Sequence, residues 1–206
     1  MCDNIIKTNI EIPKAASKLC FILDNVFTKE ECDEWIRISE EKGYEKALLN
    51  VGMGREIEAE DTRKSDRCII DSFELANKIY ERVTKYLPEE WKGFEKVSLN
   101  ERLRFLRYYP GGYFVPHMDG QYRRPDGSER SFITIQFYLN EGFEGGETTI
   151  FPGGPWVVKH EEGIPVVPKT GRILIFQHDI THEGSLLVSG TKYTIRTDVM
   201  YRQKSE

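Results

Sequence analysis

Two segments in the first half of the chain carry apolar residues at helical spacing. Thr28 precedes an amphipathic stretch that ends at Gly43, and Glu31 completes a capping-box pattern at its start. Residues 73–87 repeat apolar side chains at helical period until a proline follows. An apolar run at residues 19–27 precedes both segments and has the composition of a strand. This half therefore predicts one strand and two helices.

Other parts of the first half show no such period. Residues 1–18 predict a loosely ordered N-terminal arm, which leaves a single domain over residues 19–206. Residues 50–66 are polar and contain glycine, so we expect a loop there.

From about residue 100 the pattern changes to short strands separated by turn residues. Pro125, Asp126 and Gly127 mark a hairpin turn among them. The expected strands cover residues 102–109, 113–119, 131–140, 147–152, 172–176 and 192–202. Helices followed by many antiparallel strands predict an α+β fold in which the sheet closes into a jelly roll.

Composition sets limits on partners. The chain has 206 residues, of which 39% are hydrophobic and 31% are charged, as in an ordinary soluble domain. A net charge of −5 argues against nucleic acid, although Arg123, Arg124 and Arg130 form a local basic cluster.

Cysteine spacing and hydropathy bear on the compartment. The cysteines show neither a zinc-site pattern nor a disulfide framework. They are Cys2, Cys20, Cys32 and Cys68. The N-terminus lacks the apolar region of a signal peptide, and no 18-residue apolar run occurs. We therefore expect no membrane association and a cytoplasmic setting, with the nucleus as the alternative.

A His-X-Asp step at His117 and Asp119 is the first sign of chemistry. On an extended segment these two side chains leave on the same face and can share a metal, although a solvated strand end would look the same. His182 follows the strand at 172–176 and could complete the set, with His178 as its rival. Two imidazoles and one carboxylate form the facial triad that suits non-haem Fe(II).

Two cations on the last strand suggest a co-substrate. Lys192 and Arg196 share parity with Thr194, so all three point to one side. In a barrel interior an unpaired cation is costly and needs an anion, which a dicarboxylate such as 2-oxoglutarate would supply. Arginine can grip a carboxylate with two hydrogen bonds. The alternative for either cation is solvent, or a pairing with Asp or Glu.

Hydroxyl groups near the same strands could assist. Tyr108, Tyr109, Tyr113 and Tyr138 cluster there, and such aromatics are usually core. A buried phenol needs a partner, however, and a carboxylate of the co-substrate would serve. The hydroxyl of Thr149 is a weaker candidate for the same role.

The surroundings of these residues resemble the prolyl 4-hydroxylase-like Fe(II)/2-oxoglutarate dioxygenases. The segments that match the catalytic domain are RYYPGGYFVPHMDG, RSFITIQFYLNEGFEGGETTIFP and GRILIFQHDITHEGSLLVSGTKYTIRTDVMYR. The segments LDNVFTKEECDEWI and RKSDRCIIDSFELANKIYERV look like the family's helical support region. The resemblance spans residues 19–203. It implies a cupin-like double-stranded β-helix with supporting N-terminal helices and a catalytic core at 101–203.

The resemblance also implies roles for the site residues. His117, Asp119 and His182 would bind Fe(II). Tyr108, nine residues before His117 as in collagen-type enzymes, would contact 2-oxoglutarate. Tyr138 lies in a Tyr-Leu-Asn step similar to that of the oxygen-sensing prolyl hydroxylases.

The basic anchor has two candidates in the family pattern. Lys192 follows the distal histidine by ten residues, which is the collagen-type spacing. Arg196 follows it by fourteen, which is closer to other branches of the superfamily. We keep both and prefer Arg196 slightly, because its fork suits a carboxylate.

The activity implied is hydroxylation with O2, coupled to conversion of 2-oxoglutarate into succinate and CO2. Related halogenases have a small residue where Asp119 stands, so a carboxylate favours hydroxylation. Ascorbate binding is a further expectation from the family. The leading substrate is a peptide or protein side chain, because residues 50–66 and 120–130 form long polar loops. The resemblance makes proline the first choice. The alternatives are a free amino acid or other small molecule, and a non-catalytic sensor that binds iron and 2-oxoglutarate.

Overall fold

The fold is a double-stranded β-helix built from two antiparallel sheets. A computed structural model describes residues 4–50 and 56–204. In the larger sheet the strands run, in spatial order, β1 (Ile6–Asn9), β2 (Cys20–Asp24), β16 (Ile173–Gln177), β12 (Glu129–Tyr138), β19 (Lys192–Gln203), β10 (Arg102–Tyr108), β7 (Asp66–Asp71) and β3 (Glu45–Lys46). β9 (Phe94–Leu99) pairs with β19, and β8 (Glu90–Trp91) pairs with β9.

The smaller sheet faces the inner side of the larger one. Its strands run in the order β15 (Ile164–Val166), β14 (Thr148–Ile150), β17 (His182–Gly184), β11 (Tyr113–His117) and β6 (Arg63–Lys64). Two short ribbons complete the strands: β13 (Glu144–Gly145) with β18 (Leu187–Ser189), and β4 (Leu49–Asn50) with β5 (Glu56–Ile57). This arrangement confirms the predicted jelly roll.

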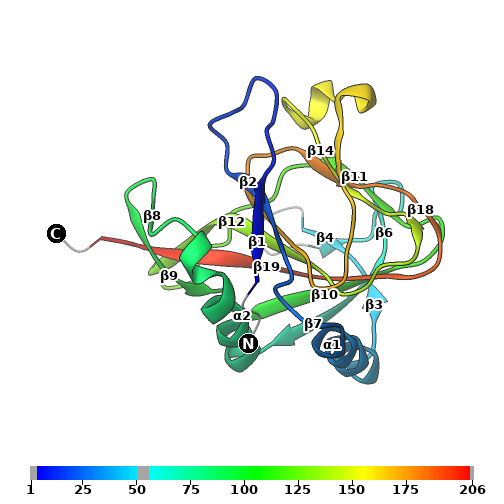
Figure 1. Cartoon of the computed structure of the whole chain (residues 1–206), viewed down its shortest axis with the longest axis horizontal. Coiled ribbons are helices and arrows are strands. Elements are labelled where there is room, and N and C mark those ends of the chain that lie inside the picture. Colours follow the sequence, from blue (N-terminus) through cyan, green and yellow to red (C-terminus); the bar gives the residue numbers. More distant parts are fainter. Residues whose placement is uncertain (1–3, 51–55, 205–206) are drawn as a thin grey trace.

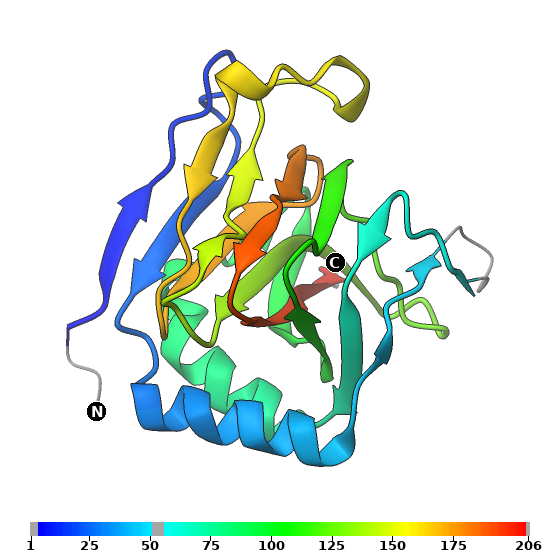
Figure 2. The ribbon, with the colours of Figure 1, turned by 90° about the vertical axis from the view of Figure 1, so that its right-hand side faces the viewer.

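Two helices cover the outer face of the larger sheet (Figures 1 and 2). α1 (Lys29–Lys42) begins with the predicted capping box of Thr28 and Glu31. It ends at Gly43, whose φ of 89° lies in a region that favours glycine. α2 (Phe73–Val83) is capped by Ser72 and continues into the 3-10 turn η1 (Thr84–Tyr86). Two more 3-10 turns, η2 (Pro155–Val157) and η3 (His160–Glu162), lie between β14 and β15.

The main core lies between these helices and the outer face of the larger sheet. Trp35 of α1 and Ile79 of α2 belong to one buried cluster with Ile195 and Val199 of β19. Removal of this apolar surface from water is the principal force that holds helices to sheet. The inner face of the same sheet is consequently free to carry polar side chains toward β11 and β17.

Two expectations are corrected by the strand pairings. The loosely ordered arm at 1–18 is wrong at Ile6–Asn9, because this segment pairs with β2 as β1 and so covers what would be an open sheet edge. The loop at 50–66 is wrong at Arg63–Lys64, which forms β6 against β11. Both strands are short and polar, so neither has the alternation of apolar and polar residues from which a strand is predicted. Residues 51–55 of that loop lie outside the described residues.

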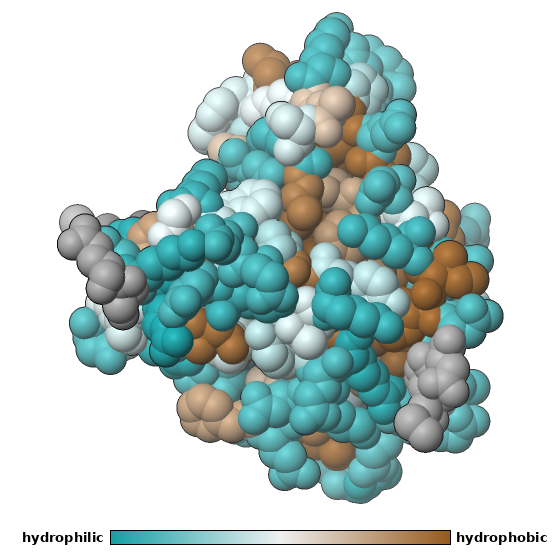
Figure 3. All heavy atoms as spheres, turned by 60° about the vertical axis from the view of Figure 1, so that its left-hand side comes forward, coloured by the Kyte–Doolittle hydropathy of each residue, from teal (hydrophilic) through white to brown (hydrophobic). Residues whose placement is uncertain are grey.

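Three of the cysteines lie within the described residues. Cys20, Cys32 and Cys68 are free and buried, whereas Cys2 lies outside the described residues. In the part of the chain that the structure describes, no helix is long and apolar enough to cross a membrane. The face shown in Figure 3 is largely hydrophilic, with separate hydrophobic patches.

Candidate metal centre and adjoining cavity

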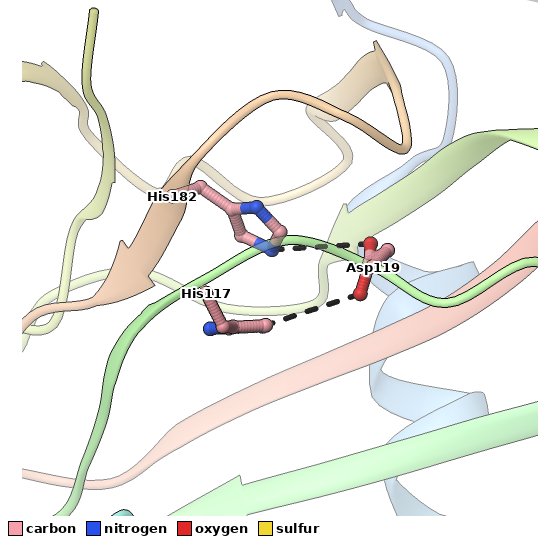
Figure 4. Close-up of side chains that lie close together, drawn as sticks. All are labelled: His117, Asp119 and His182. Atoms are coloured by element: carbon pink, nitrogen blue, oxygen red, sulfur yellow. Dashed lines mark ion pairs between the residues drawn. The ribbon is translucent and has the colours of Figure 1, made fainter. Parts of the chain in front are cut away.

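Three side chains from two strands converge between the sheets. His117 ends β11 and His182 begins β17, and the two residues are direct cross-strand partners. Asp119 follows β11, and its backbone N–H donates to the carbonyl of His178 at 3.0 Å. One ligand atom from each of His117, Asp119 and His182 lies within 4.8 Å of the others. The three side chains turn toward one another in Figure 4.

The backbone sets the orientation of both imidazoles. Nδ1 of His117 lies 2.8 Å from the carbonyl oxygen of Val115, and Nδ1 of His182 lies 3.0 Å from that of Ile180. Because a carbonyl only accepts, each Nδ1 carries the proton and each Nε2 keeps its lone pair. Those Nε2 atoms lie 4.0 and 3.8 Å from the carboxylate oxygens of Asp119. Such hydrogen bonds to the second ring nitrogen are usual for metal-binding histidines.

Protonation states also suit a metal. Burial, and then the neighbouring His182, lowers the pKa of His117 to about 3. Burial lowers the pKa of His182 too, although Asp119 opposes it. For Asp119, burial acts to raise the pKa, but Arg196 and the histidines outweigh it and hold the pKa well below its usual range. At neutral pH the site therefore presents two neutral imidazoles and one carboxylate, which metal binding requires.

Asp119 is held by two neighbours from the larger sheet. The Thr134 hydroxyl donates to its Oδ2 at 2.5 Å. The Arg196 guanidinium approaches both oxygens, with Nη2 3.0 Å from Oδ1 and Nε 3.3 Å from Oδ2. Nη2 of Arg196 also lies 3.2 Å from Asp198. Arg196 is thus already paired with two carboxylates.

A cavity adjoins the triad between the sheets, with about 90 Å³ of room for water-sized molecules. Lys192 lines it, and only 3% of this residue is exposed. Its Nζ donates to the carbonyl of Gly146 at 2.5 Å and lies 5.0 Å from the ring centroid of Tyr108. Among the described residues Lys192 forms no ion pair, and burial lowers its pKa to about 8 although Glu147 opposes the shift.

Hydroxyl groups surround the Lys192 end of the cavity. Tyr108 lies on the cavity wall. Tyr138 lies behind the wall and donates its hydroxyl to Thr148 Oγ1 at 2.7 Å, so that Thr148 is the hydroxyl in the lining. Thr149, the sequence candidate, instead bonds Ser185 at 2.7 Å. The hydroxyl of Thr194 is buried without a hydrogen-bond partner among the described residues.

Comparison with known proteins finds a family whose model matches the part of the chain that contains the triad and both cations. Residues 103–197 match the model of a family described as the 2OG-Fe(II) oxygenase superfamily. This match covers slightly less than half of the chain and makes that segment similar to the superfamily. The match contains His117, Asp119, His182 and both candidate cations. No curated protein matches the chain.

Several solved structures share the fold of this chain. A prolyl hydroxylase from Trichoplax adhaerens, in complex with a hypoxia inducible factor oxygen degradation domain peptide fragment, is 16% identical with a TM-score of 0.66, over 87% of this chain and 82% of that one. A viral collagen prolyl hydroxylase from Paramecium bursaria Chlorella virus-1, as a 2OG complex, is 19% identical with a TM-score of 0.59, over 97% and 98% of the two chains. A Pseudomonas putida prolyl-4-hydroxylase is 18% identical with a TM-score of 0.54, over 98% and 93%. At these identities the likeness is one of fold.

His178, the rival of His182, lies outside the His-Asp-His triad. It is buried, and its Nε2 lies 3.4 Å from Oδ1 of Asp198. The structure thus brings His182, and not His178, to His117 and Asp119.

Two cavity cations escaped the sequence reasoning. Arg104 of β10 and Arg63 of β6 both line the cavity beside the triad. Arg104 could have been found, because it shares strand parity with Tyr108. Arg63 gave no such signal, since it lies in the polar stretch that was expected to be a loop.

The basic cluster at 123–130 has partners of its own. Arg124 bonds Glu101 through both Nη atoms, at 2.8 Å each, and bonds Glu129 through Nε at 2.7 Å. The guanidinium of Arg130 lies 4.4 Å from the ring centroid of Phe94. These contacts join the hairpin to Glu101 and to β9.

Proposed function

We propose that this protein is an Fe(II)- and 2-oxoglutarate-dependent hydroxylase of a peptide or protein side chain, with proline the first candidate. The observation that carries the proposal is the shared cavity, where a neutral-imidazole triad adjoins a buried lysine that has no ion-pair partner among the described residues. The triad would hold iron, and the lysine would pair with a carboxylate.

The triad fits ferrous iron by its donor set. His117, Asp119 and His182 would hold the metal through two Nε2 atoms and one carboxylate oxygen, and three protein ligands leave further positions open. When bound, iron and 2-oxoglutarate supply the oxidising chemistry that uses O2, releases succinate and CO2, and leaves one oxygen atom on the substrate. Val115 and Ile180 keep the imidazoles oriented through their carbonyls, and Thr134 and Arg196 keep the carboxylate in place.

Lys192 is the better anchor for 2-oxoglutarate, which reverses the slight preference for Arg196. Arg196 already pairs with Asp119 and Asp198, whereas the Lys192 ammonium pairs with no carboxylate of the described residues. The unpaired hydroxyl of Thr194 lies on the same strand face. Because an unpaired buried charge is costly, the distal carboxylate of 2-oxoglutarate would relieve the cost at Lys192. We assign Tyr108 to the wall beside that carboxylate and Tyr138 to support of Thr148.

A peptide substrate is supported by the fold relatives. One relative is a complex with a peptide fragment, and another is named for collagen. In the present chain an outer groove beside β6 is lined by Lys46, Lys64 and Tyr109. Its lining also includes Arg63, which lines the inner cavity as well.

The test is succinate formation and gain of oxygen. Protein loaded with Fe(II) and 2-oxoglutarate without oxygen is exposed to O2 with peptide pools, metabolite pools or neither, and products are followed by mass spectrometry. We expect succinate in all three and the mass of one added oxygen atom in a peptide. Oxygen added only to a metabolite would favour a small-molecule hydroxylase. Tight 2-oxoglutarate binding without succinate under any condition would favour the sensor and contradict the proposal.

A further inference from the structure

Two arginines line the cavity besides the residues assigned to iron and 2-oxoglutarate. The cations of the lining, among the described residues, are Arg63, Arg104, Lys192 and Arg196. Of these, Lys192 is the proposed anchor of 2-oxoglutarate, and Arg196 pairs with Asp119 and Asp198. Arg63 and Arg104 lie in the same partly dry site, where a charge without a close counter-ion is costly.

Arg104 is under-satisfied in its position on the larger sheet. It lies directly opposite Arg196 in the pairing of β10 with β19, and like charges in that position repel. Its Nη1 is buried without a hydrogen-bond partner among the described residues and lies 3.6 Å from Asp198. Asp198 is already shared with Arg196 at 3.2 Å and with His178 at 3.4 Å. Arg104 thus has donors left for a ligand in the cavity.

Arg63 reaches the cavity from the smaller sheet. Its Nε donates to Ser65 at 2.9 Å, and its guanidinium lies 4.9 Å from the ring centroid of Phe114. The Phe114 ring in turn stacks on His117 with centroids 3.6 Å apart. Arg63 forms no ion pair with any residue that the structure describes. Its guanidinium therefore lies close to the metal ligands with its charge unmatched.

We propose that the substrate carries a carboxylate near its reacting carbon, and that Arg63 and Arg104 bind this carboxylate. This inference rests on the proposed function and narrows its substrate class. The planar guanidinium of arginine can donate two hydrogen bonds to one carboxylate, and hydrogen bonds between charged groups are stronger than those between neutral groups. The carboxylate can belong to a free or C-terminal residue, or to an acidic side chain beside the hydroxylated residue.

Matched pairs of probes test the charge alone. N-acetyl-L-proline and N-acetyl-L-prolinamide have the same shape, and so do N-acetyl-aspartyl-prolinamide and N-acetyl-asparaginyl-prolinamide. Binding is measured by calorimetry without oxygen, to protein loaded with Mn(II) and 2-oxoglutarate. We expect the acid of at least one pair to bind about tenfold more tightly than its amide, because it gains charge-assisted hydrogen bonds. Preference in the first pair identifies a terminal carboxylate, and preference in the second an acidic neighbour.

Variants connect the preference to the two arginines. Arg63→Gln and Arg104→Gln should each bring acid and amide toward equal affinity, while 2-oxoglutarate affinity changes little. Arg104→Lys should restore part of the preference, which a merely structural role would not predict. Arg102→Gln, which replaces an exposed arginine of β10 outside the cavity, is the control and should leave the preference intact. Thermal unfolding shows whether each variant is folded.

The outcomes are separable from those of the proposed function. Equal binding of acid and amide in both pairs, no binding of either acid, or a preference that survives in both arginine variants would overturn the inference. If succinate still forms normally in that case, the hydroxylase proposal stands alone. A clear acid preference in a protein that never forms succinate would instead leave the anion site intact and remove the hydroxylase.

Discussion

The two faces of β19 are both largely buried, yet they differ in chemistry. Ile195 and Val199 point to the helices and belong to the main apolar core. Lys192, Thr194 and Asp198 point the other way and are at most 3% exposed. The first face stabilises the fold by removing apolar surface from water. The polar groups of the second face lose their hydration when the chain folds, which lowers the free energy of unfolding. This face must therefore serve a purpose other than stability.

That contrast shows where function lies in this fold. Arg196 and Asp198 on the polar face satisfy one another, and Arg196 also reaches Asp119. Lys192 on the same face has no anion among the described residues. Substitution of the apolar residues should therefore change mainly the free energy of unfolding, and substitution of Lys192 should change mainly ligand binding.

The largest effect is expected at the metal ligands that the polar face supports. His182→Ala should abolish 2-oxoglutarate turnover and leave the fold intact, because it removes one of three ligands. His178→Ala, a buried histidine four residues away, should keep most turnover. Succinate release and a thermal unfolding curve for both variants make the comparison. An inactive His178→Ala beside an active His182→Ala would show that the distal ligand is misassigned.

On the apolar face, Ile195→Ala should destabilise the protein by about 2–5 kcal/mol, because it leaves a cavity in a well-packed core. Denaturant unfolding measures the loss. The 2-oxoglutarate affinity of the folded fraction should stay unchanged, since Ile195 points away from the cavity. A large change in that affinity would mean that the two faces are coupled.

Substitution of the proposed co-substrate anchor should have a smaller effect, and on ligand affinity instead of on stability. Lys192→Met should raise the apparent 2-oxoglutarate constant at least about tenfold, because one charge-assisted pairing is lost. Stability without ligand should not fall, because the variant no longer buries an ammonium. Arg196→Met is the matched comparison and should lower both stability and metal affinity, since it leaves Asp119 and Asp198 without their cation. Unchanged 2-oxoglutarate affinity in both variants would remove the anchor assignment.

The smallest effect is a pH dependence. The pKa of Lys192 is lowered to about 8, and only its charged form pairs with a carboxylate. The 2-oxoglutarate affinity should therefore fall about fourfold between pH 7 and pH 8.5. The unfolded chain keeps this proton to higher pH, so the ligand-free protein should gain stability as pH rises above 8. Lys192→Arg stays charged, and an identical pH profile in that variant would assign the effect elsewhere.

Local signals in the sequence predicted much of the fold. The capping box at Thr28 and the glycine at Gly43 bound α1 as expected, because helix ends are set by neighbouring residues. β1 and β6 escaped prediction because their stability comes from pairing with β2 and β11, which are distant in the chain. The hydroxyl in the cavity is Thr148 and not Thr149, because the strand register decides which of two neighbours faces inward.

The parts of the candidate site that could be predicted are those where the spacing of residues along the chain is enough to bring them together. His117 and Asp119 lie on one short segment, and His182 follows a core strand. Arg63 and Arg104 come from opposite sheets, so only the closed barrel brings them to one cavity. The proposal of Lys192 over Arg196 as the 2-oxoglutarate anchor rests on the pairing of Arg196 with Asp119 and Asp198, which only the folded chain shows. Ascorbate binding and the cytoplasmic setting stay predictions.

Anaerobic titration of the purified protein with Fe(II) and then 2-oxoglutarate tests the central claim most directly. Chelation of 2-oxoglutarate to protein-bound iron produces a visible charge-transfer absorption. We predict that this absorption appears with one equivalent of each in the wild-type protein, that Asp119→Ala lacks it while remaining folded, and that His178→Ala keeps it. A wild-type protein without the absorption, or an Asp119→Ala variant with the full absorption, would contradict the account.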